Sequence, residues 1–131
     1  MILTQFSLIG NNIMKIKTDF ITNSSSTAYM ITNLSNEQKT LVDFVKENPQ
    51  LITMYLEEYG NYWESDRNKK FTQENLIKSA EENNIIFKSM ERKYCAFGDE
   101  DGTLIGNVFD YILRDGGSSE NFKWEYEEGL R

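Results

Sequence analysis

Residues 94–127 read YCAFGDEDGTLIGNVFDYILRDGGSSENFKWEYE and contain a strand, a turn, a helix, a loop and a second strand in that order. Apolar residues recur in the middle with a period close to 3.6, which predicts a helix over 103–114 that stops at Gly116. Residues 94–97 precede it as a strand of apolar character. After it, aromatic and charged residues alternate over 122–127, as is typical of a half-buried strand.

The sequence before this stretch is mainly helical. Ser35 and Gln38 have the spacing of a capping box, and we expect them to begin a helix over 35–47. A second helix should restart at Asn48, because the proline that follows it suits the first helical position, and should end at Gly60.

A third helix is expected over 72–83. Thr72 is placed to cap it, and Phe71 and Leu76 have the positions of a hydrophobic staple. Residues 85–90 then have the pattern of another strand.

Residues 14–32 contain two short apolar segments on either side of a serine-rich loop, and we expect two strands joined as a hairpin. Residues 1–13 carry no charged side chain, and Met14 would make a natural translation start, so we interpret 1–13 as an upstream extension. We therefore predict one compact α+β domain over 14–131, in which a mostly antiparallel sheet is covered by three or four helices.

Around the loop, the sequence resembles an N-terminal signature of small proteins from Firmicutes, their phages and mobile elements, roughly DF(V/I)TNSSSS followed by a hydrophobic strand. The residues that carry the resemblance are Asp19, Phe20, Thr22, Asn23, Ser24, Ser25 and Ser26. The turn and helix over 98–113 are similar to a segment near the C-terminus of some members. No activity is established for the signature. By analogy, a phage or mobile-element origin implies an inhibitor of host defence, such as an anti-CRISPR-like protein.

Composition excludes several chemistries. The chain has no histidine and a single cysteine. Ser-His-Asp and Cys-His nucleophile systems therefore lack their histidine base, and a structural zinc site lacks its ligands. Cys95 lies in an apolar run and is expected to be a buried thiol. We predict a cytoplasmic, non-enzymatic protein without a cofactor or a metal, and no apolar run is long enough to span a membrane.

Charge indicates the kind of partner. With 14 basic and 21 acidic residues, the formal net charge is −7, which disfavours direct binding to nucleic acid and favours a basic surface on a host protein. Two regions combine aromatic and acidic side chains, as interface hot spots with electrostatic steering do. The candidate binding residues are Glu57, Glu58, Tyr59, Tyr62, Trp63 and Glu64 in the first region, and Trp124 and Tyr126 in the second.

In the second region, Glu125, Glu127 and Glu128 surround the aromatic residues, and we expect an edge strand that could pair with another chain. The function predicted from the sequence is therefore a small acidic binding module that occupies a basic protein surface, for example the nucleic-acid-binding channel of a host defence nuclease.

Two other classes stay open at this point. Asp99, Glu100, Asp101 and Asp110 could hold Mg²⁺ or Ca²⁺ in a metal-dependent phosphodiesterase, although the spacing does not fit an EF-hand loop. The third class is a self-associating structural protein. The sequence identifies neither the partner nor the oligomeric state.

Overall fold

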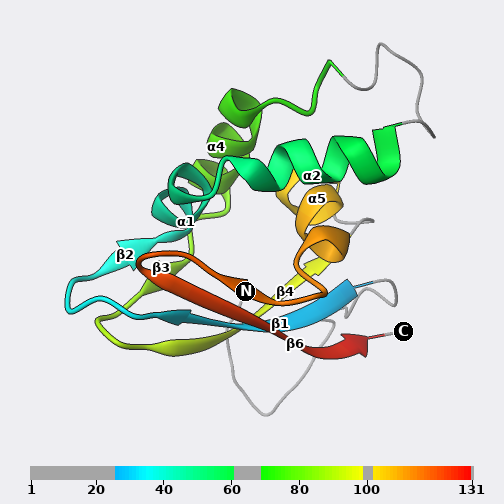
Figure 1. The fold of residues 1–131 in the computed structure, drawn as a ribbon. Coiled ribbons are helices and arrows are strands. Elements are labelled where there is room, and N and C mark those ends of the chain that lie inside the picture. Colours follow the sequence, from blue (N-terminus) through cyan, green and yellow to red (C-terminus); the bar gives the residue numbers. More distant parts are fainter. Residues whose placement is uncertain (1–25, 61–68, 99–101, 131) are drawn as a thin grey trace.

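The computed structural model describes residues 26–60, 69–98 and 102–130 (Figure 1). These residues form a four-stranded antiparallel sheet of order β4-β1-β6-β5 and a separate ladder of two short strands. The large sheet consists of β1 (Ser26–Asn33), β4 (Arg92–Gly98), β5 (Gly117–Ser118) and β6 (Phe122–Leu130), and the ladder consists of β2 (Lys39–Thr40) and β3 (Ile86–Phe87). The predicted α+β fold with a mostly antiparallel sheet is confirmed.

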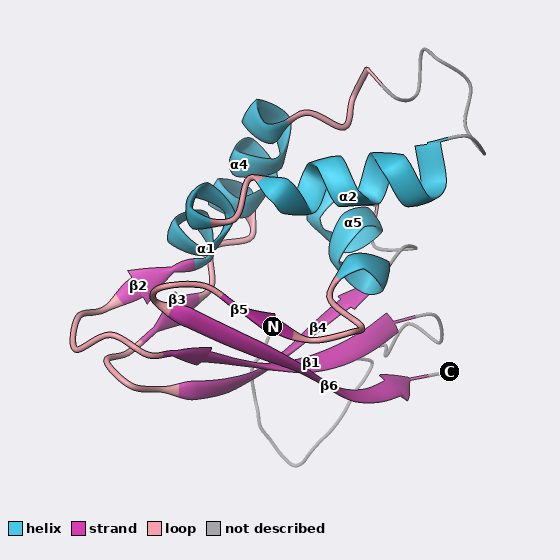
Figure 2. Cartoon of the chain, in the orientation of Figure 1, coloured by secondary structure: helices cyan, strands magenta, loops and turns pink. Residues whose placement is uncertain are grey.

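Four helices are described, namely α1 (Leu41–Glu47), α2 (Gln50–Tyr59), α4 (Gln73–Glu82) and α5 (Leu104–Ile112). Figure 2 shows them together on one side of the large sheet, with α5 closest to the strands and α2 crossing it. No described helix covers the opposite side. The sheet therefore has a helix face and an outer face.

Helix α1 begins six residues later than the sequence predicts. Thr40 is the N-cap: its hydroxyl oxygen accepts a hydrogen bond from the Asp43 N–H, and the Asp43 carboxylate accepts one from the Thr40 N–H. The expectation that Ser35 starts the helix is wrong. Ser35 instead donates its N–H and its hydroxyl to the buried side-chain oxygen of Asn33, at 2.9 and 2.7 Å, which holds Ser35 in a turn.

The remaining helix signals agree with the structure except at the start of α2, where Pro49 rather than Asn48 is the N-cap and no side chain caps the helix. Thr72 caps α4 by accepting from the Asn75 N–H, and both members of the predicted staple, Phe71 and Leu76, are buried. The helical path breaks at Asn48, which donates its side-chain amide to the Phe44 carbonyl. Gly116 follows α5 with a φ of 73°, a conformation that glycine adopts without strain.

Two predictions about strands are corrected. The strand expected over 85–90 contains only Ile86–Phe87, and it pairs with β2 rather than with the large sheet. Its neighbour Met90 has a φ of 61°, which extended backbone does not allow. The hairpin is also wrong for β1, because β4 and β6 occupy both of its edges from Ser26 to Thr32. The strand expected before the loop lies outside the described residues.

The core lies between the helices and the sheet, and Phe44 is at its centre. The Phe44 ring makes edge-to-face contacts with Phe109, Phe122 and Trp124, with centroid distances of 5.6, 5.2 and 5.3 Å. Such contacts are worth about 0.5–1.5 kcal/mol each beyond the area that they bury. They attach the first residues of β6 firmly to α1 and α5.

Candidate docking site along strand β6

Half of the first predicted region, most of the signature loop and the acidic turn before Gly102 fall outside the described residues. This holds for Tyr62, Trp63 and Glu64, for Asp19, Phe20, Thr22, Asn23, Ser24 and Ser25, and for Asp99, Glu100 and Asp101. Of the signature, Ser26 is described, and it opens β1 with only 6% of its surface exposed.

The described part of the first region lies at the end of α2. Glu57 and Glu58 are exposed, whereas the Tyr59 ring packs between Tyr55 and Tyr111, with centroid distances of 5.2 Å to each. Burial, and then the neighbouring Glu58, raise the pKa of Tyr59. Tyr59 is therefore part of the rim of the core rather than an open contact residue.

The second predicted region lies on β6, and the structure divides it. Trp124 is 5% exposed and faces the helices, where it contacts Phe44. Tyr126 lies two residues further along the same face and is 51% exposed. The Tyr126 ring meets the buried Tyr29 edge-on at 6.4 Å. The two aromatic residues share a face, but one belongs to the core and the other to the surface.

The edge of β6 that points away from β1 is covered over only a short length. Strand β5 pairs with Lys123 and Trp124. The residue that precedes β5, Gly116, belongs to the turn after α5, because its N–H donates to the Leu113 carbonyl at 2.9 Å. Strand β5 therefore does not extend along β6 beyond Trp124. The predicted edge strand is therefore corrected: β6 lies between β1 and β5 in the sheet, and only over 125–130 does no described strand cover this side of β6.

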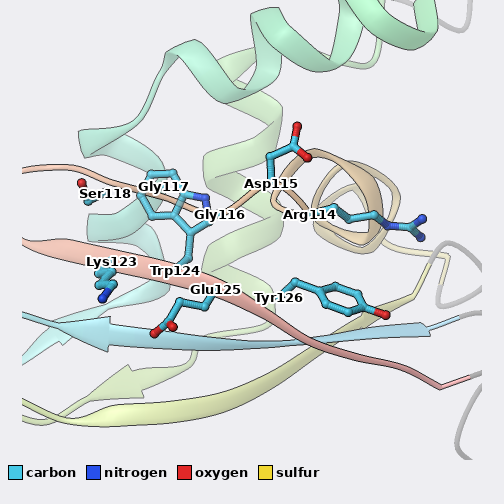
Figure 3. Close-up of a pocket in the computed structure, with 9 residues that line it drawn as sticks. All are labelled: Arg114, Asp115, Gly116, Gly117, Ser118, Lys123, Trp124, Glu125 and Tyr126. Carbon is cyan, nitrogen blue, oxygen red and sulfur yellow. The ribbon is translucent and has the colours of Figure 1, made fainter.

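A groove lies at the point where β5 ends. It has a volume of about 480 Å³. Figure 3 shows its two walls, the turn after α5 and the strand β6, with Trp124 and Tyr126 on the strand. The residues that line it are Arg114, Asp115, Gly116, Gly117, Ser118, Lys123, Trp124, Glu125 and Tyr126. The groove therefore lies next to the end of β5, beside the residues of β6 that β5 does not cover.

The outer face of β6 carries Lys123 near its start and is acidic from Glu125 onward. Paired residues on neighbouring strands point to the same face, and Glu125 is opposite Met30 while Glu128 is opposite Ala28. A register shift between Ala28 and Tyr29 produces a bulge, which leaves Glu127 without a partner residue on β1. The carboxylates of Glu125 and Glu128 therefore lie on the face that no described helix covers.

A tyrosine that the sequence did not single out lies beside these acids. The Tyr94 hydroxyl donates to the Glu128 carboxylate at 2.9 Å from two strands away, and the Tyr94 side chain is 48% exposed. Burial of its hydroxyl, and then the hydrogen bond to Glu128, raise the pKa of Tyr94. No sequence signal connects these two residues, because the sheet order alone brings β4 close to β6.

Asp110, the described member of the carboxylate cluster that the sequence leaves open as an alternative metal site, is fully buried. Its carboxylate accepts from the Thr27 hydroxyl at 2.5 Å and from the Arg114 guanidinium at 3.2 Å. The Tyr29 hydroxyl and the Arg114 Nε donate to its backbone carbonyl, each at 2.8 Å. These bonds connect α5 to β1. Asp110 and Arg114 are four residues apart within the helix expected over 103–114, so this ion pair could have been predicted from the sequence.

In the ranges that the structure covers, no group of three or more histidine, cysteine, aspartate or glutamate residues is placed to hold a metal ion. None of the described helices has the length and apolar character that crossing a membrane requires. Comparisons with protein-family models, with curated proteins and with solved structures found no match to this chain.

Proposed function

We propose that this protein is a binding module, and that the open part of β6 over 125–130 docks onto a basic surface of another protein. The observation that carries the proposal is the division of β6. Its first residues are fixed in the core, and its continuation presents Tyr126 and the acidic outer face on a strand with an edge that no described strand covers. Exposed tyrosine with surrounding carboxylates is suited to recognition of cationic surfaces.

The charge of the chain favours a protein partner. A net charge of −7 repels a phosphate backbone, whereas it steers a cationic protein surface toward the site. Glu57 and Glu58 at the end of α2 add to this field. The partner class that we propose is a host protein with a basic nucleic-acid-binding surface, which this module would block, in keeping with the resemblance of the signature loop to proteins of mobile elements.

Charge reversal tests the docking surface. In a double variant, Glu125→Lys with Glu128→Lys, we expect capture of basic proteins from host lysate to fall at least tenfold relative to the unmodified protein. The capture by the unmodified protein should itself weaken between 0.05 and 0.5 M salt, because exposed ion pairs are screened. Quantitative mass spectrometry of the captured proteins measures both effects.

The matched control is Glu81→Lys with Glu82→Lys, two exposed acids on α4 that give the same change of net charge. It should retain at least half of the capture. The control should unfold within about 0.5 kcal/mol of the unmodified protein, since Glu81 and Glu82 are exposed, whereas the change at Glu128 removes the hydrogen bond from Tyr94 and should lower the stability of the docking variant by about 0.5–1.5 kcal/mol. Equal losses of capture in the two variants would mean that net charge acts without a defined site, and the proposal would be withdrawn.

A further inference from the structure

We infer that the partner binds β6 as an added β-strand, through an extended segment that carries basic side chains at alternate positions. This inference rests on the proposed function and specifies how the docking surface is used. It follows from three features of the described residues: the direction of the free backbone groups, the two different faces of β6 and the shape of the groove.

The backbone of Tyr126 faces the edge that no described strand covers. Phe122 accepts a hydrogen bond at its carbonyl from the Ser119 N–H, so the backbone groups of Phe122 point toward β5. Hydrogen-bonding groups alternate between the two edges of a strand, and Trp124 and Tyr126 therefore point the same way. Trp124 meets β5 at Gly117, whereas β5 does not extend to Tyr126. Tyr126 offers a donor and an acceptor to a new strand.

The faces of β6 determine the side chains of that strand. Residues of an added strand that lie on the outer face would be next to Glu125 and Glu128, where lysine or arginine forms ion pairs. Residues between them would lie on the helix face, beside the half-exposed ring of Tyr126. Apolar side chains suit that position. An alternating basic and apolar segment therefore matches the site.

The groove provides room for the end of the segment. Its wall contains Gly116 and Gly117, which have no side chains to obstruct an extended chain that continues the line of β5. A Cβ on Gly116 would come within 3.2 Å of the Trp124 carbonyl oxygen, so a larger residue would crowd this point. The new strand would therefore lie beside 125–130, in line with β5 and beyond the point where β5 ends.

A second copy of the protein fits this edge poorly. Pairing between two β6 edges would bring Glu125, Glu127 and Glu128 of both chains together, and like charges opposite each other destabilise a sheet. Charge thus favours a cationic segment from a different protein.

The probe is the labelled peptide Ac-Lys-Val-Lys-Val-Lys-Val-Lys-NH2 with two backbone-methylated forms, one at the lysine nitrogens and one at the valine nitrogens. Fluorescence anisotropy with the full chain measures their affinities. Only one set of N–H groups can face β6. We therefore expect one methylated form to lose at least tenfold in affinity and the other less than threefold.

Hydrogen exchange gives a second readout. A saturating concentration of the unmethylated peptide should slow exchange of the Tyr126 amide at least tenfold, and exchange of exposed amides in α4 should not change. Equal affinity of all three peptides, or no protection at Tyr126, would overturn strand addition and leave charge-driven docking intact. Absence of binding by any of the peptides would also overturn it, whatever the result of the capture experiment. Doubling of the molecular mass in light scattering without peptide would show that a second copy occupies the edge.

Discussion

Strand β6 alternates aromatic and charged residues over 122–127, but the first and the later part of this strand have different surroundings. Over 122–124 the strand has a neighbour on each side, and its aromatic rings contact Phe44. Over 125–130 it pairs with β1 and with no other described strand, and its side chains are largely exposed. An alternating pattern therefore specifies a strand but does not specify how much of it is buried. The difference comes from β5, which is only two residues long.

The largest effect is expected from Phe122→Ala compared with Tyr126→Ala. Phe122 is fully buried between Phe44 and Phe87, so its truncation should lower the free energy of unfolding by about 3–5 kcal/mol. Truncation of Tyr126, which loses mainly its contact with Tyr29, should cost less than about 1.5 kcal/mol. Urea denaturation measures both values. Equal losses would mean that the two halves are not energetically different.

Glycine substitutions sharpen the comparison. A Cβ added at Gly117 would lie 2.5 Å from the Trp124 ring, so Gly117→Ala should cost about 1–3 kcal/mol through forced displacement of the indole. At Gly129, in the open half, the nearest atom would be the Tyr126 hydroxyl oxygen at 3.4 Å, an ordinary contact. Gly129→Ala should therefore change stability by no more than about 0.5 kcal/mol. Thermal unfolding, followed by circular dichroism, distinguishes the two, and a reversed order would contradict the assigned packing.

A smaller, pH-dependent effect is expected at Glu47, which holds the turn that leads into the buried half. Its carboxylate accepts from the Ser119 hydroxyl, and from the backbone and side-chain amides of Asn121 at 2.8 Å each. Burial opposes ionisation, but these hydrogen bonds outweigh it and lower the pKa of Glu47 below its ordinary 4.5. Because the unfolded state then binds protons more readily than the folded state, Glu47 stabilises the fold above about pH 4.5, and this contribution is lost as the pH falls through the folded pKa.

Glu47→Gln should accordingly lower the free energy of unfolding by about 1 kcal/mol at pH 7. The difference in free energy of unfolding between this variant and the unmodified protein should shrink at pH 4 and again at pH 3, as measured by urea denaturation at each pH. Glu120→Gln, which alters an exposed carboxylate in the same turn, is the control and should show no such trend. A Glu47 difference that is independent of pH would refute the assigned role of the charge.

Local signals predicted most of the helices because the responsible residues are neighbours in the chain. The periodicity over 103–114 and the cap at Thr72 both correspond to observed elements. The prediction at Ser35 failed because the buried Asn33 competes for the same hydrogen bonds. The hairpin prediction failed for a different reason. Strand order depends on contacts between distant residues, and both neighbours of β1 come from much later in the chain.

The candidate site was predicted in part. Alternation placed Trp124 and Tyr126 on one face of one strand, as the structure has them. The groove was not predictable, since it depends on the pairing of Gly117 with Trp124 and on the turn after α5. The contact between Tyr94 and Glu128 was missed because it crosses the intervening strand β1. The proposal that this surface binds a basic protein stays a prediction.

The central position of β1 has a consequence for biosynthesis. This strand leaves the ribosome long before β6, which lies at the other end of the sequence, and translation proceeds at about 5–20 residues per second. For several seconds the nascent chain must carry a strand whose apolar side chains, such as Tyr29 and Ile31, lack one of their eventual neighbouring strands. Chaperones that hold extended apolar segments should therefore associate with ribosome-bound intermediates of this protein and depart once the last strand is released.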